Sequence, residues 1–234
     1  MRSISSSIIC MDHINFERDV LFAEKLGIDY LHVDVMDGLF VPRYGIYPEI
    51  VKRISQISNL PMDLHLMVDL PELAIDYFSN FKNIKYISIH IEENEKDILR
   101  IIDKIKSYSK LAGIVLNLNT SVHTIKDLIK FSEIDSLTFM GIHPGVLTQV
   151  ARPNVVIDKV KRLSELCHNF KKVKVIQCDG GVSFNSIPDL AKVGINNFVC
   201  GSSTLYKGVK LNQPWSENKR KIKKNYYKIK ELIK

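Results

Sequence analysis

The chain repeats one local pattern about eight times, and this repetition limits the possible folds more than any other feature. A short apolar run typical of a strand is followed each time by an amphipathic run typical of a helix, without a linker or low-complexity tract between units. Strands that alternate with helices pair in parallel, because each crossover helix returns the chain to the same edge. About eight such units in 234 residues predict a single-domain (β/α)8 TIM barrel spanning residues 1–234.

The expected elements follow the apolar periodicity. Strands are predicted at residues 5–9, 30–36, 62–67, 86–90, 113–118, 136–142, 173–178 and 197–200; helices are predicted at 15–26, 48–55, from 71, at 95–107, 122–131, 154–167 and 187–193, and as a basic helix at about 216–233. An open doubly wound sheet is the alternative, but no G-x-G-x-x-G motif follows the first strand. A closed barrel would also bring the polar ends of strands two, three and seven to one mouth.

Polar residues stand at every second position of two predicted strands. His32, Asp34 and Met36 alternate in Y-L-H-V-D-V-M, so they share one face of the strand, while the residues between them are apolar. The run D-L-H-L-M repeats this arrangement around His65, and a third strand ends at Asp179. We expect these side chains to meet at the mouth of the barrel.

Four of these side chains form a candidate metal site: His32, Asp34, His65 and Asp179. Each has a structural explanation on its own, since a strand histidine often hydrogen-bonds in a core and an aspartate at a strand end often caps the next helix. Together they would bury carboxylates in an apolar pocket, which is costly unless a cation binds. The set suits one divalent metal ion, and zinc, manganese, iron and cobalt all remain possible.

Such a site supports one reaction class well. A divalent cation polarises a ketone and an adjacent hydroxyl, which acidifies the C–H bond between them. One carboxylate removes that proton to give a metal-bound enediolate, and a second carboxylate returns a proton on the opposite face. Asp34 and Asp179 come from different sides of the ring, so we expect them to epimerise the substrate. Three methionines are expected to line the pocket: Met36, Met67 and Met140.

Glycine-containing turns follow the last three predicted strands. They hold Gly145, the pair Gly180 and Gly181, and Gly201 with Ser202. Barrels commonly bind phosphate at such turns, because backbone N–H groups point at the anion. The sequence therefore predicts a small phosphosugar substrate.

Much of the formal net charge of +7 lies in the last predicted helix. We interpret it as a solvated face and expect no nucleic-acid partner, because no nucleic-acid-binding motif accompanies it. The four cysteines form no C-x-x-C pair and are interpreted as reduced thiols. No apolar stretch approaches the roughly 18 residues of a membrane span, and no signal-peptide pattern is present. These features predict a cytoplasmic protein without membrane partners.

The chain resembles the ribulose-phosphate 3-epimerase family over nearly its whole length. The run L-H-V-D-V-M-D-G-L-F-V-P is close to one family signature, D-L-H-L-M matches a second and C-D-G-G-V a third. The opening S-S-I-I-C-M-D resembles the family's P-S-I-L-S-A-D, with Ser7 at the substrate-binding serine, and G-S-S resembles its terminal phosphate turn.

The resemblance implies a TIM barrel that is usually an oligomer, and hence a homo-oligomer here. It implies four metal ligands, His32, Asp34, His65 and Asp179, with the two aspartates as the acid/base pair and His65 also among the substrate-binding residues. The family's N-P-G-F-G-G-Q loop reads H-P-G-V-L-T-Q here, so Leu147 and Thr148 replace two glycines. We expect that this loop cannot take the positive φ angles of glycine at low cost.

We therefore expect a metal-dependent ketose-phosphate 3-epimerase that interconverts D-ribulose 5-phosphate and D-xylulose 5-phosphate. Because of the altered loop, D-allulose 6-phosphate, a hexulose 6-phosphate, is an alternative substrate. An alternative from another class is a non-catalytic barrel that binds a phosphorylated ligand, or binds RNA through its basic tail. That alternative is less favoured, because binding alone does not require a complete set of metal ligands and acid/base groups.

Overall fold

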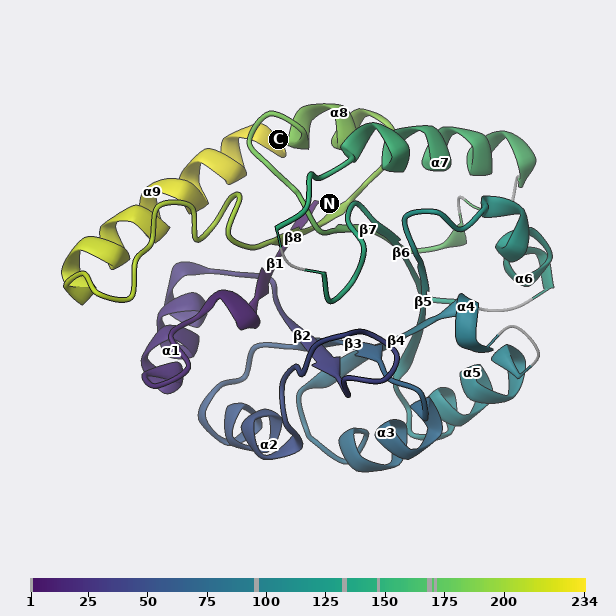
Figure 1. The fold of residues 1–234 in the computed structure, drawn as a ribbon, viewed down its shortest axis with the longest axis horizontal. Coiled ribbons are helices and arrows are strands. Elements are labelled where there is room, and N and C mark those ends of the chain that lie inside the picture. The colour runs from purple at the N-terminus through teal and green to yellow at the C-terminus, as the bar shows by residue number, and fades with distance from the viewer. Residues whose placement is uncertain (1, 95–96, 132–133, 147, 168–169, 171) are drawn as a thin grey trace.

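The protein closes into a ring of parallel strands. The structure, a computed structural model, describes residues 2–94, 97–131, 134–146, 148–167, 170 and 172–234. Within these residues eight strands form a closed barrel in sequence order, and the last strand pairs in parallel with the first. Figure 1 shows the strands as a central ring with the helices around it. The predicted TIM barrel is confirmed.

The strands are short and lie close to their predicted positions. They are β1 (Ser3–Ser7), β2 (Tyr30–Met36), β3 (Met62–Met67), β4 (Ile84–His90), β5 (Leu111–Leu116), β6 (Ser136–Met140), β7 (Val175–Asp179) and β8 (Asn197–Cys200). The bounds of β2, β3 and β8 are those predicted. Strand β4 begins two residues earlier than predicted, β6 ends two residues earlier, and β1, β5 and β7 are shifted along the chain. The first strand ends earlier than predicted, because its pairing with β2 stops at Ser7 and His32. The next three residues, Ile8–Cys10, turn into the 3-10 helix η1.

The helices cover the outside of the ring. They are α1 (Phe16–Leu26), α2 (Pro48–Ile57), α3 (Pro71–Phe78), α4 (Ile91–Asn94), α5 (Ile98–Ser107), α6 (Lys126–Phe131) after the 3-10 helix η2 (Val122–Ile125), α7 (Pro153–Leu166), α8 (Ile187–Lys192) and the basic α9 (Trp215–Leu232). The single-turn α4 was not predicted, because four residues show no helical period, and the predicted helix start at residue 95 lies outside the described residues. Among the described helices, none has the length and apolar character needed to cross a membrane.

The two faces of each strand have different roles. Outward side chains such as Val33 and Leu64 belong to the main apolar core between the strands and the helices. The inward side chains are largely polar and yet buried. They include Ser5, His32, Asp63, His65, Ser88, His90, Ser136, Thr138, Gln177 and Asn197. The inside of the barrel is therefore a polar network, and the apolar core surrounds it.

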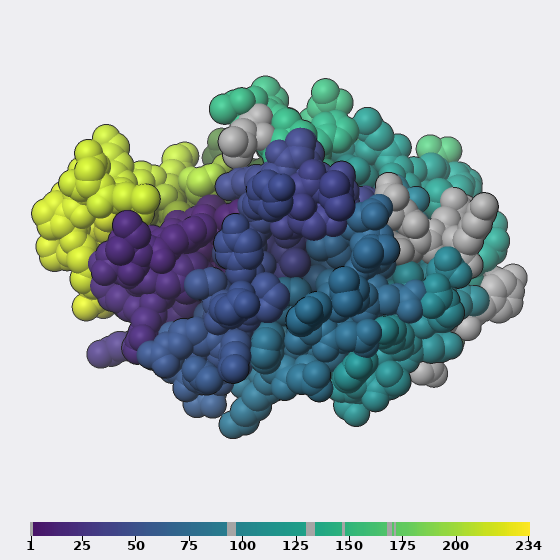
Figure 2. Space-filling view, turned by 60° about the horizontal axis from the view of Figure 1, so that its bottom comes forward, coloured from purple at the N-terminus to yellow at the C-terminus, as the bar shows by residue number. Residues whose placement is uncertain are grey.

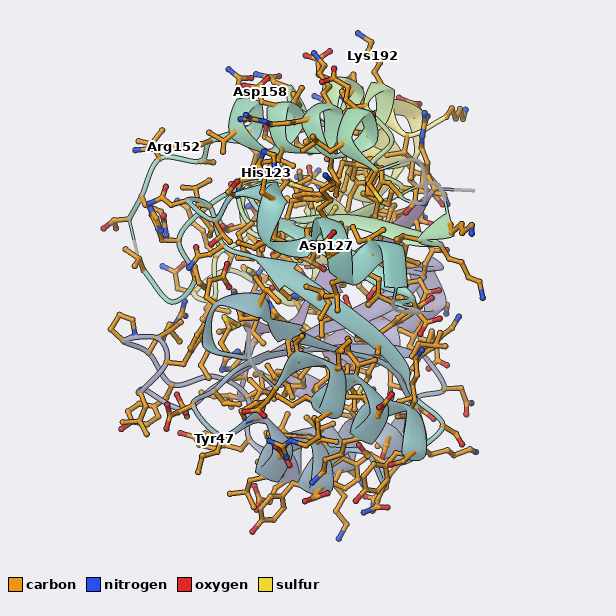
Figure 3. All side chains as sticks on the ribbon, turned by 90° about the vertical axis from the view of Figure 1, so that its right-hand side faces the viewer. Tyr47, His123, Asp127, Arg152, Asp158 and Lys192 are labelled. Carbon is orange, nitrogen blue, oxygen red and sulfur yellow. The ribbon has the colours of Figure 1, made fainter. Side chains whose placement is uncertain are left out.

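The carboxyl ends of the strands form the mouth of the barrel, and two long loops extend there. The β2–α2 loop comprises residues 37–47, and the β6–α7 loop comprises residues 141–152. Figure 3 shows Tyr47 and Arg152, the residues before α2 and α7, toward the same end of the molecule. In Figure 2 the dark blue segment that follows β2 protrudes from the surface.

Close packing inside the barrel leads to a prediction for Gly113 on β5. A Cβ atom at this position would overlap the hydroxyl oxygens of Ser88 and Ser136 on the two neighbouring strands. We expect Gly113→Ala to lower the free energy of unfolding by about 1–3 kcal/mol, because these strands must move apart. Urea unfolding measures this change.

Ser88→Ala is the matched control for this prediction. It removes a buried hydroxyl that has no hydrogen-bond partner in the described structure, so it should be close to neutral alone. It should also recover part of the stability in the double variant. An unfolding midpoint of Gly113→Ala equal to that of the unsubstituted protein would contradict this packing.

Candidate metal and active site

The pairing of β2 with β3 places the candidate ligands side by side. Asp34 is opposite His65 in this register, and His32 is opposite Asp63. Asp179, at the end of β7, reaches the same point from elsewhere on the ring. One ligand atom from each of His32, Asp34, His65 and Asp179 lies within 4.8 Å of all the others. The structure thus brings together the four residues that the sequence indicated.

The nitrogens that face this point lack hydrogen bonds. His32 Nε2 lies 3.2 Å from Asp34 Oδ1 and 3.5 Å from Asp179 Oδ2, and His65 Nδ1 lies 3.3 and 3.4 Å from the same two oxygens. Neither nitrogen makes a hydrogen bond of acceptable geometry, although both are fully buried. Ligand bonds of about 2.0–2.2 Å place adjacent donors about 3–3.5 Å apart. The spacing and the donor types therefore fit a divalent cation.

A chain of polar side chains orients His32. Its Nδ1 donates to Asp63 Oδ2 at 2.9 Å, and that oxygen also accepts from Gln177 Nε2 at 2.7 Å. Thr138 Oγ1 in turn donates to Gln177 Oε1 at 2.9 Å. With Nδ1 carrying the proton, the lone pair of His32 Nε2 is directed at the candidate metal position.

A second chain orients His65. His65 Nε2 lies 2.9 Å from His90 Nε2, and His90 Nδ1 lies 3.0 Å from Glu92 Oε2. Burial lowers the pKa of His90, which favours its neutral form. Since the Glu92 carboxylate accepts only from an N–H, we assign the proton of His90 to Nδ1, and His90 Nε2 then accepts from His65 Nε2–H. This tautomer leaves the lone pair of His65 Nδ1 for a metal. Glu92 is held by the Asn117 backbone N–H, which donates to Oε1 at 2.7 Å.

The four groups shift one another's pKa values. Burial alone would lower the pKa of His32, but the charges of Asp34 and Asp179 raise it well above its usual value. The pKa of His65 is raised by the same carboxylates against the effect of burial. Burial would raise the pKa of Asp34 and of Asp179, yet the adjacent imidazolium groups lower both. Both carboxyl groups are consequently held in the ionised form.

A cavity of about 410 Å³ opens over this cluster. Its lining includes both aspartates and every other predicted site residue that is not a histidine: Ser7, Met36, Met67, Met140, Gly145, Gly180, Gly181, Gly201 and Ser202. Ser7 Oγ donates to Asp34 Oδ2 at 3.4 Å. His32 and His65 are each only 1% exposed and do not line the cavity. Their ring nitrogens face the candidate metal position, which lies between them and the two aspartates that do line the cavity.

The altered β6–α7 loop keeps a glycine-like conformation. Thr148 has φ 51°, so the loop takes a positive φ angle here in spite of the cost expected for a side chain; Leu147 lies outside the described residues. The side chain of Gln149 holds the loop: its Oε1 accepts from His143 N at 2.7 Å, and its Nε2 donates to the carbonyls of His143 and Val146 at 2.6 and 2.7 Å. These bonds offset the cost of the left-handed conformation of a β-branched residue.

Comparison with known protein families shows to which family this chain belongs. The model of the ribulose-phosphate 3 epimerase family matches residues 3–205. The chain belongs to this family. The resemblance seen in the sequence motifs is thus confirmed.

Individual relatives agree with the family assignment. The ribulose-phosphate 3-epimerase of Bacillus subtilis (strain 168) is 34% identical over 205 residues, which cover 87% of this chain and 92% of that protein. The Helicobacter pylori (strain J99) ribulose-phosphate 3-epimerase is 32% identical over 85% of this chain and 88% of its own length. Among solved structures, 3-hexulose-6-phosphate synthase from Salmonella typhimurium has a TM-score of 0.63 at 14% identity, covering 99% of this chain and 98% of its own. This last likeness shows the fold alone.

Sequence reasoning missed several residues of this site. Gln177 and His90 stand on inward positions of β7 and β4, and Asp63, the first residue of the run D-L-H-L-M, was given no role. The period-two pattern could have suggested them, since His90 and Gln177 are polar residues within apolar runs. Arg43, which lines the cavity from the β2–α2 loop, had no signal in strand periodicity.

The His90–Glu92 pair yields a prediction about metal affinity. We expect Glu92→Gln to weaken binding of a divalent cation about 10- to 100-fold, because an amide does not hold the His90 proton at Nδ1 as the carboxylate does. Competition with a chromophoric chelator measures this affinity without turnover. Asp76→Asn, which changes an exposed carboxylate on α3, is the control. An unchanged affinity of Glu92→Gln would contradict the assigned tautomer.

Metal binding should also release protons. The raised pKa values of His32 and His65 keep both imidazoles protonated above pH 6.5, the ordinary pKa of histidine, before a metal binds. A cation requires the neutral rings, so its affinity should rise as the pH increases through the raised pKa values. Calorimetry in buffers of different ionisation enthalpy counts the released protons. An affinity that does not change between about pH 6 and 8 would contradict the charged state of the rings.

Proposed function

We propose that this chain is a metal-dependent ribulose-phosphate 3-epimerase that interconverts D-ribulose 5-phosphate and D-xylulose 5-phosphate. The observation that supports this most directly is the placement of Asp34 and Asp179. Their carboxylates come from β2 and β7, both line the cavity, and both lie 3.2–3.5 Å from the two ligand nitrogens. Family membership, and relatives that bear this enzyme's name, support the same activity.

The two carboxyl groups carry the proton chemistry in this proposal. One, ionised, accepts the proton of the C3–H bond. The other is also ionised in the free protein, so it must first take up a proton from solvent, which it then gives to C3 on the opposite face. The carbon loses and gains one proton, so configuration inverts without net oxidation. The pair ends the turnover with its roles exchanged, which suits a reversible reaction.

A metal ion would be held by the four clustered side chains, His32, Asp34, His65 and Asp179. When bound, it would supply Lewis acidity that polarises the ketone and the adjacent hydroxyl. The chain's own contribution is to direct two imidazole lone pairs at the site through Asp63 and His90. Met36, Met67 and Met140 exclude competing hydrogen-bond donors from the reacting carbons.

The phosphate end of the substrate is assigned to the glycine turns of the mouth. Gly180 and Gly181 have φ 82° and 69°, so the turn after β7 uses conformations that present its backbone without side chains. Gly201 and Ser202 line the same cavity after β8.

A homo-oligomer is also part of the proposal, as the family resemblance implies. The four cysteines are free thiols, which supports the proposed cytoplasmic location.

Hydrogen exchange at C3 tests the activity. The metal-loaded protein in D2O should introduce deuterium at C3 of ribulose 5-phosphate and of xylulose 5-phosphate, as followed by NMR. Asp34→Asn and Asp179→Asn should each lower the rate of epimerisation at least about 100-fold. If each carboxylate serves one face, each variant retains exchange in a different epimer without inversion. Asp158→Asn on α7, an exposed position labelled in Figure 3, is the control.

Metal content measured on each variant separates a lost acid/base group from a lost ligand. Exchange in D-allulose 6-phosphate with none in the pentulose phosphates would assign the alternative hexulose substrate. Absence of exchange in every ketose phosphate by a metal-loaded, folded protein would reject the epimerase proposal.

A further inference from the structure

One cationic side chain lines the cavity without a partner. Arg43, on the β2–α2 loop, is the only lysine or arginine among the described residues of the lining. It is half-buried, and within the described structure its guanidinium makes no hydrogen bond and no ion pair. Arg18 on α1, by contrast, pairs with Asp12 and Asp19. A half-buried guanidinium without an anion indicates a ligand position.

The backbone around Arg43 is held against the end of β2. Gly45 N donates to Met36 O at 3.0 Å and Ile46 N donates to Asp34 O at 2.9 Å, while Asp37 forms a β-bridge with Tyr44. A Cβ atom at Gly45 would overlap the carbonyl oxygen of Asp34, so the loop returns in direct contact with the strand that carries a candidate ligand. Arg43 is therefore fixed at the mouth by ordered backbone.

The same loop contacts two of the glycine turns. A Cβ atom at Gly145 would lie 2.6 Å from Val41 Cβ, which places the β2–α2 loop directly on the β6–α7 loop. On the other side, a Cβ atom at Gly201 would lie 3.3 Å from Cys10 Sγ, so the segment after β1 packs on the turn after β8. Cys10, Arg43 and Gly201 all line the same cavity, so the charge of Arg43 faces the space to which the phosphate was assigned.

The charge balance of the cavity favours an anion at Arg43. Asp34 and Asp179 contribute two negative charges, which a bound cation would neutralise. A phosphate monoester brings up to two more, and backbone N–H groups carry no full charge. At one of the two positions where the family pattern has glycine, this chain has Thr148, which lines the cavity and brings a side chain to the β6–α7 loop.

We propose that Arg43 binds the phosphate group of the substrate, together with the glycine turns after β7 and β8. This inference rests on the proposed function for the identity of the substrate, but not for the binding of the anion. A planar guanidinium can donate two parallel N–H bonds to two phosphate oxygens, which a lysine ammonium cannot match. Arg43 is then a determinant of specificity for phosphorylated over unphosphorylated ketoses.

Direct titration with inorganic phosphate tests the anion site without turnover. The experiment compares the metal-loaded unsubstituted protein, Arg43→Ala, Arg43→Lys and Arg152→Ala by calorimetry. Arg152 is exposed on the rim, does not line the cavity and is labelled in Figure 3, so its replacement removes the same charge without the proposed contact. Arg43→Ala should weaken phosphate binding about 10- to 100-fold, and Arg43→Lys should weaken it less. Arg152→Ala should bind phosphate as the unsubstituted protein does.

Steady-state kinetics of epimerisation provide a second, independent test of the role of Arg43. Arg43→Ala should raise KM for ribulose 5-phosphate by a similar factor, with a smaller effect on kcat, whereas Arg152→Ala should leave both parameters unchanged. Equal phosphate binding by Arg43→Ala and the unsubstituted protein overturns the inference, as does an equal loss in Arg152→Ala or no phosphate binding at all. A phosphate affinity that depends on Arg43 in a protein without C3 exchange would support the anion site and reject the epimerase proposal.

Discussion

The site depends on one lateral register, the pairing of β2 with β3. It sets Asp34 beside His65 and His32 beside Asp63, so a ligand from each strand and one hydrogen-bond partner are placed by the same backbone ladder. Side chains alternate along a strand, and a slip of one residue would move His32 and Asp34 to the outer face among the helices. The slip would also bring Leu31 and Val33 from the apolar core into the polar interior. Burial of the outer face thus holds the inner face in register, and stability and site geometry have a common origin.

The polar interior of the barrel acts as a frame for the two imidazoles. His32 is tied through Asp63 to Gln177 and Thr138, and His65 through His90 to Glu92. Buried polar groups are tolerated when they are hydrogen-bonded, and the atoms of these described chains that lack a partner are the two nitrogens that point at the candidate metal position. The unsatisfied atoms therefore lie where a ligand is needed, and the network around them fixes the tautomers on which binding of a cation depends.

The sequence predicted the fold and the four clustered side chains because both follow from periodicity. Alternation of apolar strands and amphipathic helices indicated the barrel, and the two-residue spacing of His32 and Asp34 put them on one face. Partners across the barrel could not be derived in this way, since the contact of Gln177 with Asp63 joins residues 114 positions apart and depends on ring closure. The conformation of the β6–α7 loop could not be predicted from the sequence either. Thr148 takes φ 51° because Gln149 braces the loop, a tertiary effect that overrides the preference of a β-branched residue.

The barrel fold alone does not distinguish this chain from TIM barrels with unrelated sequences. The 3-hexulose-6-phosphate synthase of Salmonella typhimurium shares this fold at 14% identity, so the ring of strands accommodates sequences that share little. What separates such proteins is the set of side chains at the strand ends and in the loops after them. Here the strand ends carry the four clustered side chains of the candidate metal site, while Arg43 and Thr148 lie on the two loops that contact each other through Val41 and Gly145. The strand register does not determine which side chains these loops carry. The loops can therefore vary on the proposed substrate-binding side while the four clustered side chains keep their positions.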